Sequence, residues 1–225
     1  MQKFIYERKF GLKDRVFLAA ASIFFALYAS FSLTYFGGAC SKISDSVVRL
    51  HILANSDSET DQNIKLAVRD ALLKRNTELL TAGVNSENAE SYFEASKEEL
   101  QKTANRVLKE NGFDYGAEIK LCREIYPTRV YGELTFPSGE YTSVKVVLGS
   151  GKGHNWWCVM YPPLCIPAAE SVRSDADQAE AYFDQGEYDL LTNPRRYRAR
   201  LKCAEVFSRL WDRIRESADE FEKST

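Results

Sequence analysis

The chain has 225 residues and a formal net charge of −2, so its overall charge gives no indication of a nucleic-acid-binding protein. It contains two histidines, and its five cysteines lack the paired short spacing of zinc ligands. We therefore predict no metal, no cofactor and no small-molecule substrate.

The N-terminus combines a basic flank with an uncharged segment. The net charge through Arg15 is +3, and the 21 residues at 16–36 carry no charge. A helix of this length, at about 1.5 Å per residue, can cross a hydrocarbon core of about 30 Å. A basic flank keeps the N-terminus in the cytoplasm. We predict a cytoplasmic flank at 1–15, a signal or transmembrane segment at 16–36, a linker at 37–46 and one extracytoplasmic domain at 47–225.

The fate of this segment stays open. It is longer than the apolar region of about 7 to 15 residues in most signal peptides, which favours an anchor. Small residues at Gly37–Ala39 would nevertheless suit cleavage. Lipidation at Cys40 ranks third, because Gly37 stands where a lipoprotein box needs a branched aliphatic residue. A buried core helix is a further alternative, disfavoured by the apolar character of every face.

The folded part begins with a predicted strand and two helices. Residues Val47–Ala54 are mostly aliphatic, as in a strand buried on both faces, with Arg49 and His51 on one side. A lone strand histidine is more often hydrogen-bonded than catalytic or pH-sensing. Helical periodicity predicts one helix from about Ser56 to Leu80 and a second from about Ser86 to Asn111.

Three acids near the first helix invite a metal interpretation. Asp57, Asp61 and Asp70 are better explained otherwise, because early acids complement the positive end of the helix dipole and Asp70 lies too far along to join them.

Three further strands are predicted at Tyr115–Arg123, Thr128–Phe136 and Tyr141–Leu148, with a hairpin turn at Pro137–Gly139. A strand, two helices and three strands predict an α+β fold, with a mixed or antiparallel sheet and the helices on one face.

The segment Gly149–Cys165 concentrates glycine, tryptophan, proline and cysteine, which predicts a specified loop. Rigid exposed aromatic residues are typical of interaction hot spots. The candidate partner-binding residues are Asn155, Trp156, Trp157, Tyr161, Pro162, Pro163 and Leu164. Adjacent side chains on an extended segment point oppositely, so we expect one tryptophan in the core and the other exposed. The alternative is that both pack beneath the sheet.

Two cysteines of this loop, Cys158 and Cys165, are the candidates for a disulfide outside the cytoplasm. The alternative is a pair of buried thiols. Cys158 and His154 are also the only nearby thiol and base, so the alternative function is an extracytoplasmic cysteine hydrolase acting on cell-wall peptide. A disulfide would silence that thiol, and we expect no acid to orient His154. The glycines lack the Lys-Ser or Lys-Thr ending of a nucleotide-binding P-loop.

The C-terminal part turns acidic, with a short helix expected near Ala176–Phe183. A long amphipathic helix is predicted from about Tyr197 to Phe221. Packing on the sheet is favoured for it over binding to a membrane surface or partner.

Three sequence blocks support a family resemblance. They are Val48–Ser58 with the sequence VRLHILANSDS, Tyr126–Gly132 leading to Tyr141, and Asn155–Cys165 with the sequence NWWCVMYPPLC. These blocks resemble the stage II sporulation protein R family over about Val47–Cys165.

The resemblance implies a role that the residues alone do not give. Such proteins are made in the forespore and exported into the space between the two sporulation membranes. There they activate a membrane-embedded aspartic protease, which processes the precursor of the early mother-cell sigma factor. The implied protein is a signalling ligand and not an enzyme, with the protease and the membrane as its partners.

Overall fold

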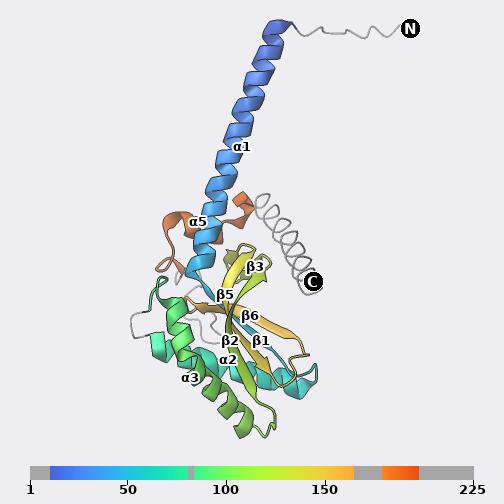
Figure 1. The fold of residues 1–225 in the computed structure, drawn as a ribbon, viewed down its shortest axis with the longest axis vertical. Coiled ribbons are helices and arrows are strands. Elements are labelled where there is room, and N and C mark those ends of the chain that lie inside the picture. The colour runs from blue at the N-terminus through green and yellow to red at the C-terminus, as the bar shows by residue number, and fades with distance from the viewer. Residues whose placement is uncertain (1–10, 81–83, 165–178, 198–225) are drawn as a thin grey trace, which may run out of the picture. The chain divides into compact units, whose positions relative to one another are not determined.

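The computed structural model describes residues 11–80, 84–164 and 179–197, and the chain divides into two units, Met1–Gly38 and Ala39–Thr225 (Figure 1). The second unit has helices and a mixed four-stranded sheet, so the predicted α+β class is confirmed.

Helix α1 (Leu12–Ser46) contains the uncharged segment. Its apolar stretch has no buried share, and large side chains such as Phe17, Phe24 and Phe31 are exposed. The helix therefore fits a signal sequence or a membrane anchor, and the buried-core alternative is wrong. Residues 37–46, predicted as a linker, continue the helix.

The main sheet has the order β2-β5-β1-β6. At its centre β1 (Val48–Leu53) runs parallel to β5 (Gly139–Leu148). Strand β2 (Ala117–Tyr126) pairs antiparallel with β5, and β6 (Asn155–Tyr161) pairs antiparallel with β1. The central position of β1 explains its aliphatic sequence, because it is covered on both faces.

Helices α2 (Glu59–Leu80) and α3 (Ala89–Glu110) cover one face of this sheet, as predicted. Their periodic apolar residues, such as Val68, Leu72 and Leu100, pack against Leu50 and Val146 in one hydrophobic core. Burial of aliphatic side chains of this kind contributes about 1.5–3 kcal/mol each.

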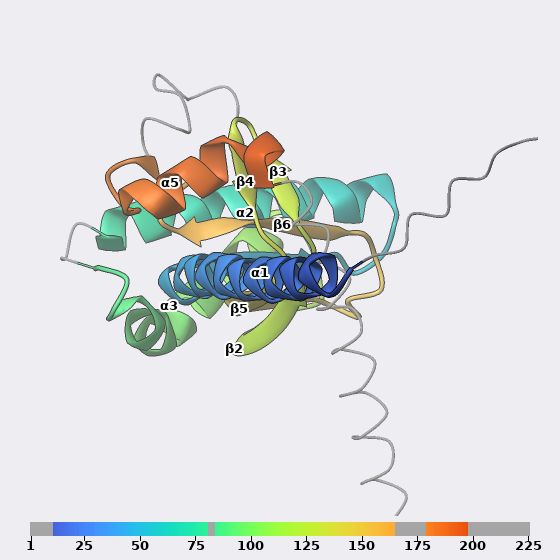
Figure 2. The ribbon, with the colours of Figure 1, turned by 90° about the horizontal axis from the view of Figure 1, so that it is seen from above.

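A small second layer lies against the other face. Strands β3 (Arg129–Tyr131) and β4 (Leu134–Phe136) form a hairpin, and helix α5 (Gln185–Thr192) packs beside β4 (Figure 2). The hairpin prediction at Pro137–Gly139 is wrong. The chain reverses at Gly132, which has a positive φ of 53°, and Pro137–Ser138 instead connects the two sheets.

The predicted loop at Gly149–Cys165 is wrong in its middle part, because Asn155–Tyr161 forms edge strand β6. Of the helix expected at Ala176–Phe183, the five described residues, 179–183, form mainly a turn and not a continuous helix, so that prediction is wrong over this part. Nearly all of the long helix expected at Tyr197–Phe221 lies outside the described residues.

Candidate functional site

The face of the sheet away from α2 and α3 carries polar and aromatic side chains from all four strands. Side chains alternate between the faces of a strand, so the neighbours of the core residues point to this side. This set, which we call the polar face, comprises Arg49, His51, Glu124, Tyr126, Ser143, Lys145 and Trp157.

His51 lies at the centre of the polar face. Its Nδ1 is 3.0 Å from Glu124 Oε2, and its Nε2 is 3.1 Å from Asn155 Oδ1. The indole of Trp157 stacks on the imidazole, with ring centroids 3.6 Å apart and planes 18° apart. His51 is thus held on three sides and is only 5% exposed. The interpretation of His51 as a hydrogen-bonded strand histidine fits this geometry.

Glu124 links His51 to Lys145, whose Nζ donates to Glu124 Oε1 at 2.8 Å. Burial alone would raise the pKa of Glu124, but the hydrogen bonds from His51 and Lys145 outweigh it and lower the pKa to about 2. The bond to Glu124 also raises the pKa of Lys145. Glu124 therefore remains a carboxylate at neutral pH.

Arg49 is fully buried at the other end of the polar face. Four rings surround its guanidinium carbon at 4.5–5.4 Å, those of Tyr126, Tyr131, Phe136 and Tyr141. Nη2 donates to Tyr131 Oη at 2.7 Å, whereas Nε and Nη1 have no hydrogen-bond partner in the described part of the chain. A desolvated cation among aromatic rings gains up to about 2 kcal/mol from a cation–π contact. Arg49 therefore attaches the β3–β4 hairpin to the main sheet.

The tandem tryptophans point to opposite faces, as their adjacency predicts. Trp157 lies on the polar face over His51, whereas Trp156 lies on the helix side under Arg69, whose guanidinium is 4.3 Å from the ring centroid. Both side chains are half-buried, so the expected division into one core and one exposed tryptophan is wrong.

The other candidate partner-binding residues differ in exposure. Asn155 is exposed and Pro163 is half-buried, whereas Tyr161, Pro162 and Leu164 are buried. The Tyr161–Pro162 peptide bond is cis. Of this set, Asn155 and Trp157 are therefore the residues that the polar face presents together.

The structure does not bring the alternative hydrolase pair together. Cys158 is buried in the core, and His154 is 78% exposed before the start of β6. Four residues of extended chain span about 13 Å, too far for a hydrogen bond between the two side chains. The expectation that no acid orients His154 is wrong, because its Nδ1 is 2.5 Å from Asp57 Oδ1.

The glycine run before β6 has a structural explanation. The backbone N–H of Ser150 donates to Asn55 Oδ1 at 2.8 Å, and that of Gly153 donates to the Ala54 carbonyl at 2.8 Å. A Cβ at Gly153 would lie 2.2 Å from the Ser56 carbonyl oxygen. The glycines thus let two loops approach closely, and we call this contact the loop clasp.

The acids near α2 are engaged by protein groups. Asp61 accepts hydrogen bonds from Ser56, Asn55 and Tyr115. Asp70 pairs with Arg69, and Asp57 contacts His154. Cys165 lies outside the described residues, so the Cys158–Cys165 disulfide stays a prediction.

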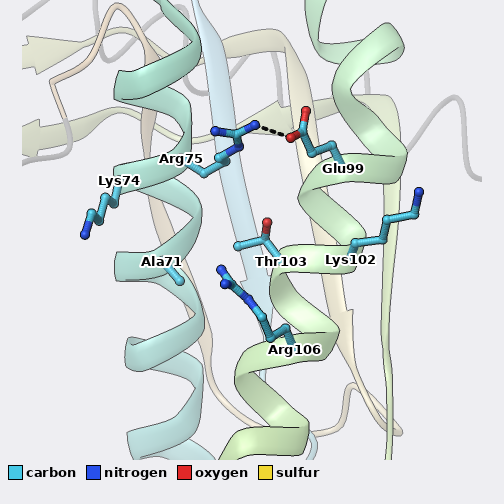
Figure 3. A pocket seen from close by; sticks show the side chains of 7 residues that line it. All are labelled: Ala71, Lys74, Arg75, Glu99, Lys102, Thr103 and Arg106. Atoms are coloured by element: carbon cyan, nitrogen blue, oxygen red, sulfur yellow. Dashed lines mark hydrogen bonds and ion pairs between the residues drawn. The ribbon is translucent and has the colours of Figure 1, made fainter.

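A basic hollow of about 600 Å³ lies between α2 and α3 (Figure 3). Arg75 pairs with Glu99 across it, while Lys74 and Lys102 point away from the space between the helices. Arg106 is the remaining cation and is directed into the hollow.

Sequence reasoning missed Glu124, Lys145 and Tyr126 on the polar face. A signal was present in β2, because Glu118, Lys120 and Glu124 stand at alternate positions and contradict a simple apolar pattern. The convergence of the missed residues on His51 depends on strand order, which that pattern does not contain.

Comparison with known proteins gives a consistent result. A family model described as Stage II sporulation protein R matches residues 44–171, which include every strand from β1 to β6. A Bacillus subtilis (strain 168) protein named Stage II sporulation protein R is 34% identical over 139 residues, which are 60% of this chain and 62% of that protein. The chain thus matches less than two thirds of that relative's length. No solved structure gives a significant match.

Proposed function

We propose, because this chain belongs to the stage II sporulation protein R family, that it is an intercompartmental signalling protein of sporulation. In this role it is exported from the forespore into the intermembrane space and activates the membrane-embedded aspartic protease that processes the early mother-cell sigma factor precursor. The exposed apolar surface of α1 supports export or membrane attachment.

The observation that carries the proposal is the arrangement of the family's tryptophan motif on the polar face. Trp157 is stacked on His51 and lies edge-on to Tyr126, with ring centroids 4.9 Å apart, so its position is fixed before any partner binds. A preorganised aromatic side chain loses little entropy on binding. The signal acts only if this surface binds the active state of the protease more tightly than the inactive state.

A paired substitution tests the proposal. Trp157→Ala should abolish processing of the sigma factor precursor, measured by immunoblot in sporulating cells in which the variant replaces the native gene. Trp156→Ala is the matched control, because it removes the same ring from the helix side. We expect it to process the precursor in proportion to the amount of folded protein. Both variants are checked by circular dichroism. Normal processing with folded Trp157→Ala would remove the polar face from the interface, and normal processing in a gene deletion would refute the signalling role itself.

The hydrolase alternative makes a contrasting prediction. A Cys158→Ser variant that folds and signals normally would discard it. The separation of Cys158 from His154 leads us to expect that result.

A further inference from the structure

Strand β2 has an outer edge that is only half covered. It is the end strand of the described sheet. The N–H of Ala117 donates to Asn105 Oδ1 at 2.7 Å and the N–H of Ile119 donates to Gln101 Oε1 at 2.9 Å, so α3 covers the start of this edge. In an antiparallel strand alternate residues direct their backbone groups outward. The backbone N–H and C=O groups of Leu121, Arg123 and Ile125 therefore also point outward.

The outward N–H and C=O groups of these three residues have no hydrogen-bond partner among the described residues. The opposite edge differs, because α2 covers it. There Lys65 Nζ donates to the His154 carbonyl at 2.9 Å, and Asn76 Nδ2 donates to the Met160 carbonyl at 2.8 Å. A row of free N–H and C=O groups is a template for another strand. The second half of β2 is thus the open edge of the described sheet.

A groove of about 820 Å³ lies beside this open edge, between β2 and the start of α3. Three glutamates line it, Glu87, Glu90 and Glu94. Lys97 pairs with Glu94 and offsets its charge, so the negative charges of Glu87 and Glu90 remain at the groove.

Arg123, the cation that lines the groove, already has two acidic neighbours. Its guanidinium lies 3.6 Å from Asp45 and 3.7 Å from Glu140. The groove therefore keeps an excess of negative charge.

From this geometry we propose that the Leu121–Ile125 edge binds an extended, basic segment of a partner protein by β-strand addition. Backbone hydrogen bonds to β2 would supply the affinity. Lysine or arginine at alternate positions of the segment would face Glu87 and Glu90, because strand side chains alternate. The inference is independent of the proposed signalling role. A second copy of the chain is a poorer occupant, because symmetric pairing would bring two acidic grooves together.

The probe is a fluorescent heptapeptide of alternating lysine and valine, added to the full chain in uncharged detergent micelles. A glutamate–valine heptapeptide and a lysine–valine peptide N-methylated at alternate amides are the control probes. Anisotropy should show saturable binding of the first probe alone. Hydrogen-exchange mass spectrometry should show slower exchange confined to residues 121–125, the open part of the edge.

Two matched pairs of variants locate the site. Arg123→Pro removes an outward N–H without breaking the β2–β5 ladder, and should weaken binding about tenfold relative to Arg123→Ala, which keeps that N–H. Glu87→Gln with Glu90→Gln should weaken binding about three- to tenfold. Glu110→Gln, at the far end of α3, should leave it unchanged.

Several results would overturn the inference. Absence of probe binding would do so, as would equal binding by the Arg123→Pro and Arg123→Ala variants. So would amides at 121–125 that are already protected from exchange without the probe, or equal binding of the lysine–valine and glutamate–valine probes. Sedimentation of a dimer that Arg123→Pro dissociates would assign the edge to a second copy instead.

Discussion

Glu124 shows how one side chain acquires its importance from contacts distant in sequence. It accepts hydrogen bonds from His51, 73 residues away, and from Lys145 on the neighbouring strand. A carboxyl whose pKa is lowered on folding stabilises the fold above its ordinary pKa, and this contribution is lost as pH falls toward the folded value. For Glu124 that window runs from about 4.5 down to about 2.

We therefore expect Glu124→Gln to lower the free energy of unfolding at pH 7 by up to about 3 kcal/mol, with the difference from the native chain shrinking between pH 5 and pH 2. Chemical denaturation at a series of pH values measures this. Glu118→Gln is the control, because Glu118 is exposed on the same face of β2. A pH-independent difference for Glu124→Gln would mean that its charge does not stabilise the fold.

At the scale of elements, the loop clasp joins the end of β1 to the approach of β6. Gly153 is required there because of the neighbouring backbone and not because of its own φ angle. The carbonyl of Ser56 occupies the space that a methyl group would need, and backbone cannot move aside as a flexible side chain can.

We expect Gly153→Ala to destabilise the domain by about 2–3 kcal/mol, measured by thermal or chemical unfolding. Gly112→Ala is the comparison. Gly112 has a φ of 80° but no atom near the added methyl, so it should cost only about 1 kcal/mol of backbone strain. Equal losses in the two variants would show that the loops are not clasped in solution.

Two of the sequence blocks that resemble the family form neighbouring strands of the sheet. The first block forms β1, which supplies core residues to one face and Arg49 and His51 to the other. The third block forms β6 and carries Trp157 to the same polar face. The first and third blocks therefore meet as paired strands of the sheet.

At the scale of the whole molecule, one unit contains most of an apolar helix and the other contains the α+β fold. The basic flank before the helix predicts that the domain lies outside the cytoplasm. In protoplasts of non-sporulating cells that express the chain, the outer face of the membrane is accessible, so added protease should digest the domain of the unmodified chain.

An arginine in the middle of the uncharged segment tests that prediction. Ala26→Arg adds about 2.5–3.5 kcal/mol to the cost of membrane insertion, so it should retain most of the domain inside the cell. Ala26→Leu should leave export unchanged. Protection of the unmodified domain from external protease would place it in the cytosol and contradict the proposed localisation.

The sequence by itself determined the helices α2 and α3, the strands β1, β2 and β5, the apolar N-terminal segment and the family. These features depend on local periodicity or on residue order, which a single chain displays directly. It also indicated that Trp156 and Trp157 point in opposite directions, because extended backbone alternates its side chains.

Only the tertiary structure decided that Asn155–Tyr161 is a strand, because the hydrogen bonds that hold it come from β1 about a hundred residues earlier. For the same reason the meeting of His51 with Glu124, Asn155 and Trp157 was not predicted. Contacts across a sheet depend on strand order and register, and these are set by the burial of the whole core and not by any local stretch of sequence.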